Sequence, residues 1–509
     1  MRRHALAVAL LCATLYLLAQ ALEPPDARKQ VISAGEASQD AKLATSRIKL
    51  APGLKAELHA AEPLLANPVA FCFDLQGNIY VAETYRLHEG VTDNRGHMYW
   101  LNDELALTTV EERDAKYRKH LKDRYASFEK EREQIRKLVD SKGTGKPDTS
   151  HVFSDNYRRA VDGLGAGVLV HQGNIYFTCI PDLWLLQDTK NAHRADVQQS
   201  LSTGYGVHTS FIGHDLHGLV VSPVDGKIYF SIGDRGANIQ TQEGKKIEVP
   251  HTGAVFRCYP DGSELELVAQ GLRNPQELAF DDDGNLFTGD NNSDSGDKAR
   301  FMYLPFGADG GWHIGWQYLE RPYSRGPWNS EHLWYPPRKD QPAYIVPALI
   351  NIGDGPSGLV YYPGTGLPQR YQGHFFLCDF RGTPSNSGIR SFRTEPHGAG
   401  FSVINSEQFA WGVLATDVDF GPDGGLYILD WVEGWGKTGK GRIHRLFDPA
   451  HQNSSLARDI QTLLASDWKS KTVAELVPLL GHADRQIRVE TQTTLLPHRV
   501  QATASASIL

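Results

Sequence analysis

Cysteine is scarce in this chain, and no two cysteines are spaced as Cys-x-x-Cys. The sequence has 509 residues and five cysteines: Cys12, Cys72, Cys179, Cys258 and Cys378. The missing pair excludes both the Cys-x-x-Cys-His attachment site of a covalent haem and a zinc ribbon. The last four cysteines lie in strand-like runs such as FCFD and FFLCDF. This favours buried single thiols, although one pair could still form a disulfide.

The chain also lacks an excess of positive charge. Its formal net charge is −8 and its pI is about 6.2, which argues against nucleic acid as a partner. It is rich instead in glycine (49), proline (27) and aromatic residues (10%), a composition typical of many strands joined by tight turns. Its length exceeds that of an ordinary compact domain, whereas repeat folds reach this size.

The N-terminus predicts a secretory signal peptide over residues 1–21. Arg2 and Arg3 form a basic start, residues 5–18 are apolar, and Ala19-Gln20-Ala21 gives the small-x-small cleavage pattern. An uncleaved anchor remains open, because the apolar stretch is nearly long enough to span a bilayer. We therefore predict export to the periplasm or the cell surface, followed by a linker over residues 22–47.

One pattern recurs six times: a strand, a turn such as Asp-x-x-Gly, a second strand and an acidic residue. Each copy alternates with period 2 around its turn, which is the signal of a β-hairpin. Six hairpins with room for two more strands each predict an all-β fold, a six-bladed β-propeller over residues 48–447. KAELHAAEP and GRIHRLF are strand-like segments that could pair to close the ring. The copies begin at Val69, Ala166, His217, Leu278, Leu359 and Val418, and their acidic residues are Glu83, Asp182, Asp234, Asp290, Asp379 and Asp430. We expect most of these carboxylates to accept backbone N–H groups in turns.

A helical insertion is predicted in the first blade, over residues 103–150. Thr109 and Glu112 have the spacing of a capping box. Apolar residues then recur at helical spacing, from Tyr117 to Leu138. We expect the insertion to pack against the propeller, and a docking role remains the alternative.

The C-terminal region is predicted to be helical. Residues 456–500 are Leu-rich and resemble the beginning of a HEAT-type helical pair, which cannot bury its own apolar face alone. Residues 501–509 have no amphipathic pattern and are expected to form a disordered tail. We interpret this ending as a shortened C-terminus.

Two consecutive stretches carry a family resemblance. GHDLHGLVVSPVDGKIYFSIGDRG begins at Gly213, and GLRNPQELAFDDDGNLFTGDNNSDSGD begins at Gly271. In order, they resemble two blades of the soluble quinoprotein glucose/sorbosone dehydrogenases. These are six-bladed propellers that hold pyrroloquinoline quinone (PQQ) and calcium on their top face. The resemblance implies PQQ and calcium as cofactors here.

The same resemblance assigns roles to individual residues. It implies that His214 is the catalytic base and that Asp297 is the carboxylate supporting it. It implies quinone contacts for Arg273 and Asn274. Calcium would be held in an oxygen-rich run typical of hard cations, by the backbone carbonyls of Asn292 and Ser293 and by Asp294. Two residues of other blades, Arg381 and Lys437, are further candidates for contact with an anionic cofactor.

A second resemblance covers residues 48–490. CIPDLW, GHDLHG, GDNNSDSGD, GPSGLVYYPGTGLP and DWVEGW are similar to the PVC-type membrane-bound dehydrogenase or haem-binding CxxCH proteins. Their usual order is signal peptide, propeller, HEAT repeats and a cytochrome c module, and this sequence lacks that module. The resemblance implies a c-type cytochrome as electron acceptor.

Three functional hypotheses follow. The first is an exported quinoprotein-type dehydrogenase that oxidises a sugar or alcohol hydroxyl by hydride transfer to a quinone, with electrons passing to a cytochrome-type acceptor. The second is a non-catalytic propeller that binds a glycan or a protein partner. The third is a propeller–HEAT scaffold. His214 separates them, because it is either the base of an active site or a turn histidine satisfied by hydrogen bonds.

Overall fold

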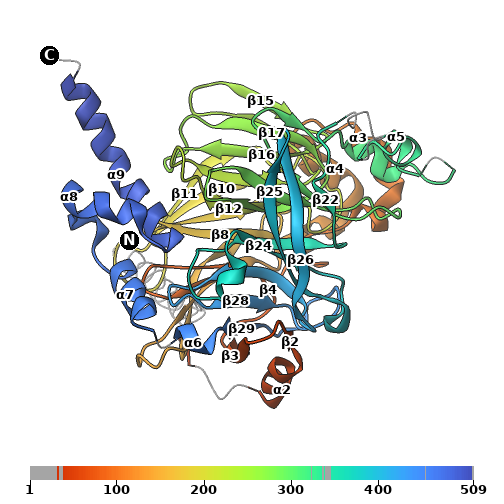
Figure 1. Ribbon diagram of the computed structural model, residues 1–509. Helices are drawn as coiled ribbons and strands as arrows, with labels where there is room; N and C mark the ends of the chain where they lie inside the picture. Colours follow the sequence, from red (N-terminus) through yellow and green to blue (C-terminus); the bar gives the residue numbers. More distant parts are fainter. Residues whose placement is uncertain are drawn as a thin grey trace, which may run out of the picture.

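The computed structural model describes residues 31–33, 38–322, 324–334, 338, 345–452 and 454–506. Its strands form the predicted six-bladed β-propeller (Figure 1). The predicted signal peptide, residues 1–21, lies outside the described residues. Within them, no helix combines the length and the apolar character needed to cross a membrane.

Each of the first three blades is a mainly antiparallel sheet whose first strand is innermost. Blade one contains β4 (Pro68–Phe73), β5 (Ile79–Glu83), β6 (Glu133–Val139) and β7 (Thr149–Tyr157), with β1 (Val31–Ser33) at its edge. Blade two contains β8 (Gly165–His171), β9 (Asn174–Cys179), β10 (Asp182–Gln187) and β11 (Val197–Thr203). Blade three contains β12 (Leu216–Val221), β13 (Ile228–Ile232), β16 (Gly253–Cys258), β17 (Glu266–Leu272) and β21 (Ala308–Asp309). A separate hairpin, β14 (Ala237–Gln240) and β15 (Lys246–Val249), interrupts blade three.

The other three blades complete the circle. Blade four contains β18 (Pro275–Phe280), β19 (Leu286–Asp290), β20 (Arg300–Tyr303) and β22 (Ile350–Asn351). Blade five contains β23 (Pro356–Tyr361), β24 (His374–Asp379), β25 (Gly388–His397) and β26 (Gly400–Trp411), with β2 (Lys49–Leu50) at its edge. Blade six contains β27 (Ala415–Phe420), β28 (Leu426–Asp430), β29 (Arg442–Phe447) and the N-terminal β3 (Lys55–Ala61).

The two ends of the propeller join in blade six, as the sequence predicted. β3 pairs with β29 in antiparallel order, from Lys55 opposite Phe447 to Ala61 opposite Arg442. The innermost strands also pack in sequence around the axis, and β27 returns to contact β4. The N-terminal strand β3 thus forms the outer strand of blade six, and the ring is closed by strands from both ends of the chain.

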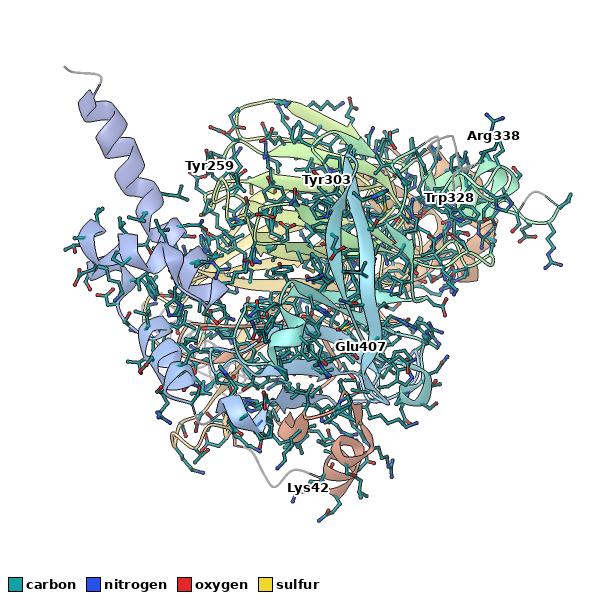
Figure 2. The ribbon with its side chains drawn as sticks, in the orientation of Figure 1. Lys42, Tyr259, Tyr303, Trp328, Arg338 and Glu407 are labelled. Atoms are coloured by element: carbon teal, nitrogen blue, oxygen red, sulfur yellow. The ribbon has the colours of Figure 1, made fainter. Side chains whose placement is uncertain are left out.

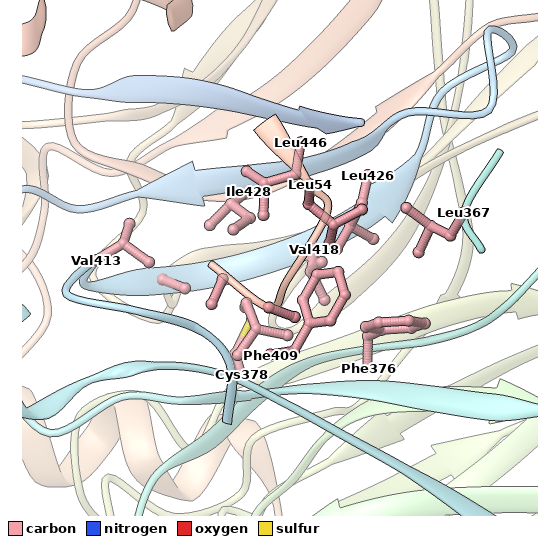
Figure 3. Packing of buried hydrophobic residues seen from close by; sticks show 14 of the residues in the cluster. Leu54, Leu367, Phe376, Cys378, Phe409, Val413, Val418, Leu426, Ile428 and Leu446 are labelled. Atoms are coloured by element: carbon pink, nitrogen blue, oxygen red, sulfur yellow. The ribbon is translucent and has the colours of Figure 1, made fainter. Parts of the chain in front are cut away.

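The core lies between the blades. Among the described residues, one cluster of buried apolar side chains fills each of the six interfaces between neighbouring blades. Figure 3 shows the cluster between blades five and six, where Phe376 and Cys378 meet Val418 and Ile428. Successive side chains of a strand point to opposite faces. For this reason Ile428 packs toward blade five, whereas Leu429 packs toward blade one.

The four cysteines outside the N-terminus are buried single thiols, as predicted. Cys72, Cys179, Cys258 and Cys378 are all free. Burial raises the pKa of the Cys258 thiol to about 12, so this side chain behaves as a small apolar group and not as a nucleophile.

Most of the repeated acidic residues are structural, as expected. Glu83, Asp290, Asp379 and Asp430 each end the second strand of a blade and accept at least one backbone N–H. Each also pairs with a cationic or imidazole side chain of the next strand, in the pairs Glu83–Arg136, Asp290–Arg300, Asp379–Arg390 and Asp430–His444. Asp182 and Asp234 depart from this pattern, because both lie beyond the second strand of their blade.

The insertion in blade one is helical over a shorter range than predicted. It contains η2 (Asn94–Trp100), α3 (Leu101–Leu105), α4 (Val110–Leu121) and η3 (Lys122–Glu129). The capping box of Thr109 and Glu112 is present at the start of α4. The predicted helical spacing was wrong for Ile135 and Leu138, which are buried on β6. Apolar spacing alone does not distinguish a strand buried on both faces from a helix.

Two segments predicted to lack structure are partly ordered. Residues 22–47 were assigned to a linker, but β1 pairs with β7, and α2 (Gln39–Arg47) begins at the cap Ser38. Residues 501–509 were assigned to a disordered tail, but α9 (Arg485–Ala506) continues through residue 506; residues 507–509 lie outside the described residues.

The C-terminal helices lie on the opposite side of the propeller from the insertion and from α5 (Gly326–Ser330) (Figure 1). They are α6 (Pro449–Gln452), α7 (Ser455–Leu464), α8 (Val473–Leu476) and α9, which projects beyond the sheets. Arg485 of α9 donates to the carbonyl oxygen of Phe280 at 2.7 Å, and Gln486 donates to that of Phe420 at 2.9 Å. The start of α9 thereby covers one end of the central channel, where a cavity of about 320 Å³ lies.

Candidate active site

His214 and Asp234 form a buried pair at the opposite end of the channel. His214 lies in the turn before β12, and Asp234 follows β13. The imidazole Nδ1 of His214 is 2.7 Å from Oδ1 of Asp234. Because β12 and β13 are antiparallel, the start of one and the end of the other meet at the same end of the blade. Gly233 permits this approach, since a Cβ at that position would lie 2.7 Å from Cβ of His214.

Three donors hold the Asp234 carboxylate. Besides His214, Ser210 donates its hydroxyl to Oδ1 at 2.5 Å, and the indole Nε1 of Trp312 donates to Oδ2 at 2.9 Å. Burial alone would raise the pKa of Asp234, but the electrostatic interaction and hydrogen bond with His214 and the charge of Arg273 lower it to about 2. An ionised carboxylate only accepts hydrogen bonds, so Nδ1 of His214 carries a proton. Nε2 has no hydrogen-bond partner among the described residues.

Asp297 does not support His214, which corrects the predicted role. Its carboxylate accepts the backbone N–H of Ser293 and, at 2.6 Å, the Ser293 hydroxyl. It also accepts the indole N–H of Trp328 at 3.3 Å. The loop from residue 291 to 297 therefore folds onto itself, and the carboxylate that contacts His214 is that of Asp234. Asp234 was visible in the sequence as one of the six repeated acidic residues, but the repeat alone predicts a structural role.

Arg273 and Asn274 lie beside this pair, between β17 and β18. The carboxylate of Asp290 accepts both of their backbone N–H groups, at 3.0 and 2.7 Å. Asn274 donates its side-chain amide to the carbonyl oxygen of Gly213 at 3.0 Å, next to His214. Arg273 and Asn274 are each only 1% exposed. The structure thus brings together three predicted residues: His214, Arg273 and Asn274.

Several buried polar atoms around this group have no partner within the described part of the chain. They are Nη1 of Arg273, Oδ1 of Asn274 and Nε2 of Gln317. Arg273 and Gln317 are joined directly, because Nε of Arg273 donates to Oε1 of Gln317 at 2.8 Å. Buried polar groups in native proteins are normally hydrogen-bonded. Unpartnered donors and acceptors gathered beside a histidine–carboxylate pair indicate a place where a polar ligand completes the hydrogen bonding.

The family model described as a domain of unknown function, DUF7133, matches residues 40–435. This chain belongs to that family. No curated protein matches the sequence. In this DUF7133 protein the match includes all the residues of the candidate site and ends before the C-terminal helices.

Several solved structures of low sequence identity match the DUF7133 chain. A glucose dehydrogenase matches with a TM-score of 0.48 and 14% identity, over 77% of this chain and 98% of that chain. The apo-form of the soluble aldose sugar dehydrogenase from Escherichia coli matches with a TM-score of 0.48 and 14% identity, over 77% and 99%. The PQQ-bound form of aldose sugar dehydrogenase from Streptomyces coelicolor matches with a TM-score of 0.45 and 15% identity, over 78% and 99%. At these values, the chemistry of the DUF7133 chain has to be argued from its own residues.

The insertion of blade one packs over the candidate site, in agreement with the preferred prediction for it. The carboxylate of Glu104 on α3 accepts the backbone N–H of Ser210 at 2.9 Å. The guanidinium of Arg95 lies 4.3 Å from the ring centre of Phe211, which in turn lies 5.9 Å from the ring of His214. These contacts join the insertion to the loop before β12 and shield the histidine from bulk water.

Arg381 and Lys437, the two other predicted cofactor contacts, are occupied elsewhere in the DUF7133 fold. Arg381 forms ion pairs with Asp379 and Asp354, both at 2.8 Å. Lys437 pairs with Glu89 at 2.9 Å and donates to the carbonyl oxygen of Tyr85 at 2.5 Å. Within the described ranges, neither residue has a hydrogen bond or ion pair to His214, Arg273 or Asn274. The structure therefore does not bring these two residues into the site.

The residues of the loop do not fit calcium. The carbonyl oxygen of Ser293, one predicted ligand, accepts Nε of Arg325 at 2.7 Å. The carboxylate of Asp294, another predicted ligand, pairs with Nη2 of Arg273 at 2.7 Å. The side-chain oxygen of Asn292 accepts the backbone N–H of Asp294 at 3.2 Å. Two guanidinium charges at the loop would repel a cation. In addition, no group of three metal-ligating Asp, Glu, His or Cys side chains occurs among the described residues.

Gln317 and Arg325 belong to the site but were missed by sequence reasoning. Gln317 lies in η4 (Ile314–Tyr318) and Arg325 lies directly before α5, both in the segment between β21 and β22. Figure 2 shows Trp328 of α5 on the same side of the molecule as the insertion of blade one. The segment carries no copy of the repeat, so no periodic signal pointed to it.

Proposed function

We propose that this protein is an exported quinoprotein-type dehydrogenase that oxidises a hydroxyl group of a sugar or alcohol. The observation that carries the proposal is the buried His214–Asp234 pair, with Nε2 of His214 left without a hydrogen-bond partner among the described residues. Export rests on the signal-peptide pattern of residues 1–21, and transfer of the electrons to a c-type cytochrome rests on the resemblance of the sequence.

The role of His214 is to remove the hydroxyl proton at Nε2. The neutral imidazole donates its Nδ1–H to Asp234, which leaves the lone pair of Nε2 available for a substrate proton. Asp234 holds the ring in this tautomer and stabilises the positive charge that forms on it. Ser210 and Trp312 keep the carboxylate in place. The pair therefore supplies a general base with a fixed direction.

Arg273, Asn274 and Gln317 would hold the cofactor and its negative charge. PQQ, when bound, supplies an ortho-quinone that accepts two electrons and a proton from the alcohol carbon. Its carboxylates and quinone oxygens are hydrogen-bond acceptors, and Nη1 of Arg273 and Nε2 of Gln317 are buried donors without partners among the described residues. In a site shielded from water, a fixed guanidinium stabilises developing negative charge more strongly than it would in solvent.

The experiment is reconstitution of the purified, exported chain with PQQ. Uptake of PQQ is measured by absorbance after gel filtration, and reduction of an artificial acceptor is followed over a panel of sugars and alcohols. We expect reduction that requires both PQQ and one class of hydroxyl substrate. Absence of PQQ uptake would refute the proposal, and saturable binding of a glycan without turnover would favour the non-catalytic propeller instead.

A further inference from the structure

Arg325 clamps the loop where calcium was predicted. It precedes α5 in the left-handed region, with φ of +60°. Its Nε donates to the carbonyl oxygen of Ser293 at 2.7 Å, and its Nη1 donates to that of Gln317 at 2.6 Å. A left-handed conformation at a residue other than glycine is unfavourable and persists only where surrounding contacts determine it. Here the two carbonyl contacts supply that constraint.

A second guanidinium lies close to the first. Burial lowers the pKa of Arg325, and the nearby charge of Arg273 lowers it further. Arg273 is joined to Gln317 through Nε, and Gln317 is joined to Arg325 through its carbonyl oxygen. The three residues therefore form one connected group, in which two like charges repel each other.

The negative groups nearby are mostly engaged. The carboxylate of Asp294 pairs with Nη2 of Arg273, but it is 47% exposed and thus weakened by solvent. The Asp297 carboxylate accepts neutral donors from Ser293 and Trp328. Within the connected group of Arg273, Gln317 and Arg325, two buried donors have no partner among the described residues: Nη1 of Arg273 and Nε2 of Gln317, on residues only 1% and 2% exposed.

We propose that Arg273, Gln317 and Arg325 form a metal-free binding site for a carboxylate of a small molecule. Arg325 supplies the positive charge at the loop, and the open donors of Arg273 and Gln317 receive the carboxylate oxygens. A guanidinium presents several N–H groups in a planar fork that matches a carboxylate. The proposal concerns binding alone and does not depend on the redox reaction. The carboxylate belongs either to a quinone cofactor or to an acidic sugar.

Calorimetric titration in EDTA tests the site with three probes: PQQ, glucuronate and the neutral sugar glucose. We expect PQQ, glucuronate or both to bind, and glucose to bind at least about tenfold more weakly, because charged hydrogen bonds account for the affinity. Binding of PQQ alone assigns the site to a cofactor, and binding of glucuronate assigns it to an acidic substrate. Either result supports the proposal, whereas binding of neither anion overturns it.

Two variants locate the effect. Arg325→Met removes the charge at the loop, and the isosteric Gln317→Glu replaces the open donor with a negative acceptor. Each should weaken anion binding at least about tenfold. Arg393→Met is the control, because Arg393 pairs with Glu395 on the long hairpin of blade five. If Arg325→Met fails to fold, Gln317→Glu alone decides. Affinities within twofold of the wild type in the folded variants would overturn the site, as would anion binding that requires added calcium.

Discussion

The indole Nε1 of Trp312 donates to Oδ2 of Asp234 across 2.9 Å, while Oδ1 of the same carboxylate accepts from His214. Trp312 is 2% exposed and belongs to the segment after β21. Both oxygens of Asp234 are therefore occupied by donors from different segments of the chain. This arrangement fixes the plane of the carboxylate and, through it, the direction in which Nε2 of His214 points.

Asp234→Asn should impair the base without removing it. An amide has one acceptor oxygen and one NH2 group, so it cannot accept from Trp312 on one side and from Ser210 and His214 on the other. We expect kcat of the reconstituted enzyme to fall on the order of a hundredfold or more, with KM little changed. A kcat within threefold of the wild-type value, at an unchanged KM, would assign Asp234 a purely structural role.

His214→Ala should abolish catalysis while leaving the fold intact. Loss of a positioned general base lowers the rate by about a hundredfold or more. The matched control is His397→Ala, since His397 is an exposed histidine at the end of β25. Steady-state rates and melting temperatures of both variants are compared with the wild type. Activity of His214→Ala within threefold of the control would exclude His214 as the base.

The architecture was predictable because it repeats. Period-2 strands around Asp-Gly turns predict hairpins locally, and six copies predict a closed ring without knowledge of any long-range contact. The pairing of β3 with β29 was predictable for the same reason: two strand-like segments at the ends had no other partner. β6 was not predictable, because Ile135 and Leu138 are buried on a strand that is covered on both faces.

The site was only partly predictable, because it lies where the repeat is broken. His214, Arg273 and Asn274 precede innermost strands, so their positions follow from the hairpins. The partner of His214 depends on which carboxylate turns inward: Asp234 lies two residues beyond β13, whereas Asp297 is captured by its own loop. Gln317 and Arg325 approach from an irregular segment whose path is set by tertiary packing, and local sequence does not encode that path.

The stabilisation contributed by the buried carboxyl groups of Asp417 and Asp419 should decrease as the pH rises from about 5 to 8. Burial raises the pKa of Asp419 to about 7 and that of Asp417 to about 8, both beside the channel cavity. An unfolded Asp titrates near 3.9. Between these values each of the two carboxyl groups binds more protons in the folded protein than in the unfolded chain, so its contribution to the free energy of unfolding falls with increasing pH. The stabilisation is complete below about pH 4 and is lost as the pH rises through the folded-state pKa values of the two carboxyl groups.

Asp419→Asn tests this origin of the pH dependence. The variant removes one buried carboxylate, whose Oδ1 accepts the adjacent N–H of Phe420 and no other donor among the described residues. From pH 5 to pH 8 the melting temperature of the variant should change by about 2 °C or more in the upward direction relative to that of the wild type. Asp196→Asn is the control, because hydrogen bonds from Thr189 lower the pKa of Asp196 to about 2, outside this range. Parallel curves for the wild type and Asp419→Asn would rule out this carboxylate as a source.

Arg86 should determine whether the insertion stays closed over the site. Its guanidinium is fully buried and donates to five carbonyl oxygens, those of Phe128, Glu131, Gly90, Arg159 and Asp162. In Arg86→Met these carbonyls lose their donors, and unsatisfied buried polar groups cost about 1–3 kcal/mol each. We expect trypsin to cleave after the exposed residues Lys122 and Lys130 at least about tenfold faster. The reason is that Arg86 no longer holds the segment that runs from η3 to β6. Arg158→Met, at an exposed neighbouring arginine, is the control.

The insertion covers the loop before β12, so Arg86→Met should also increase quenching of tryptophan fluorescence by iodide. Digestion and quenching identical to the control would show that the contacts of α3 and α4 with that loop hold the cover without Arg86.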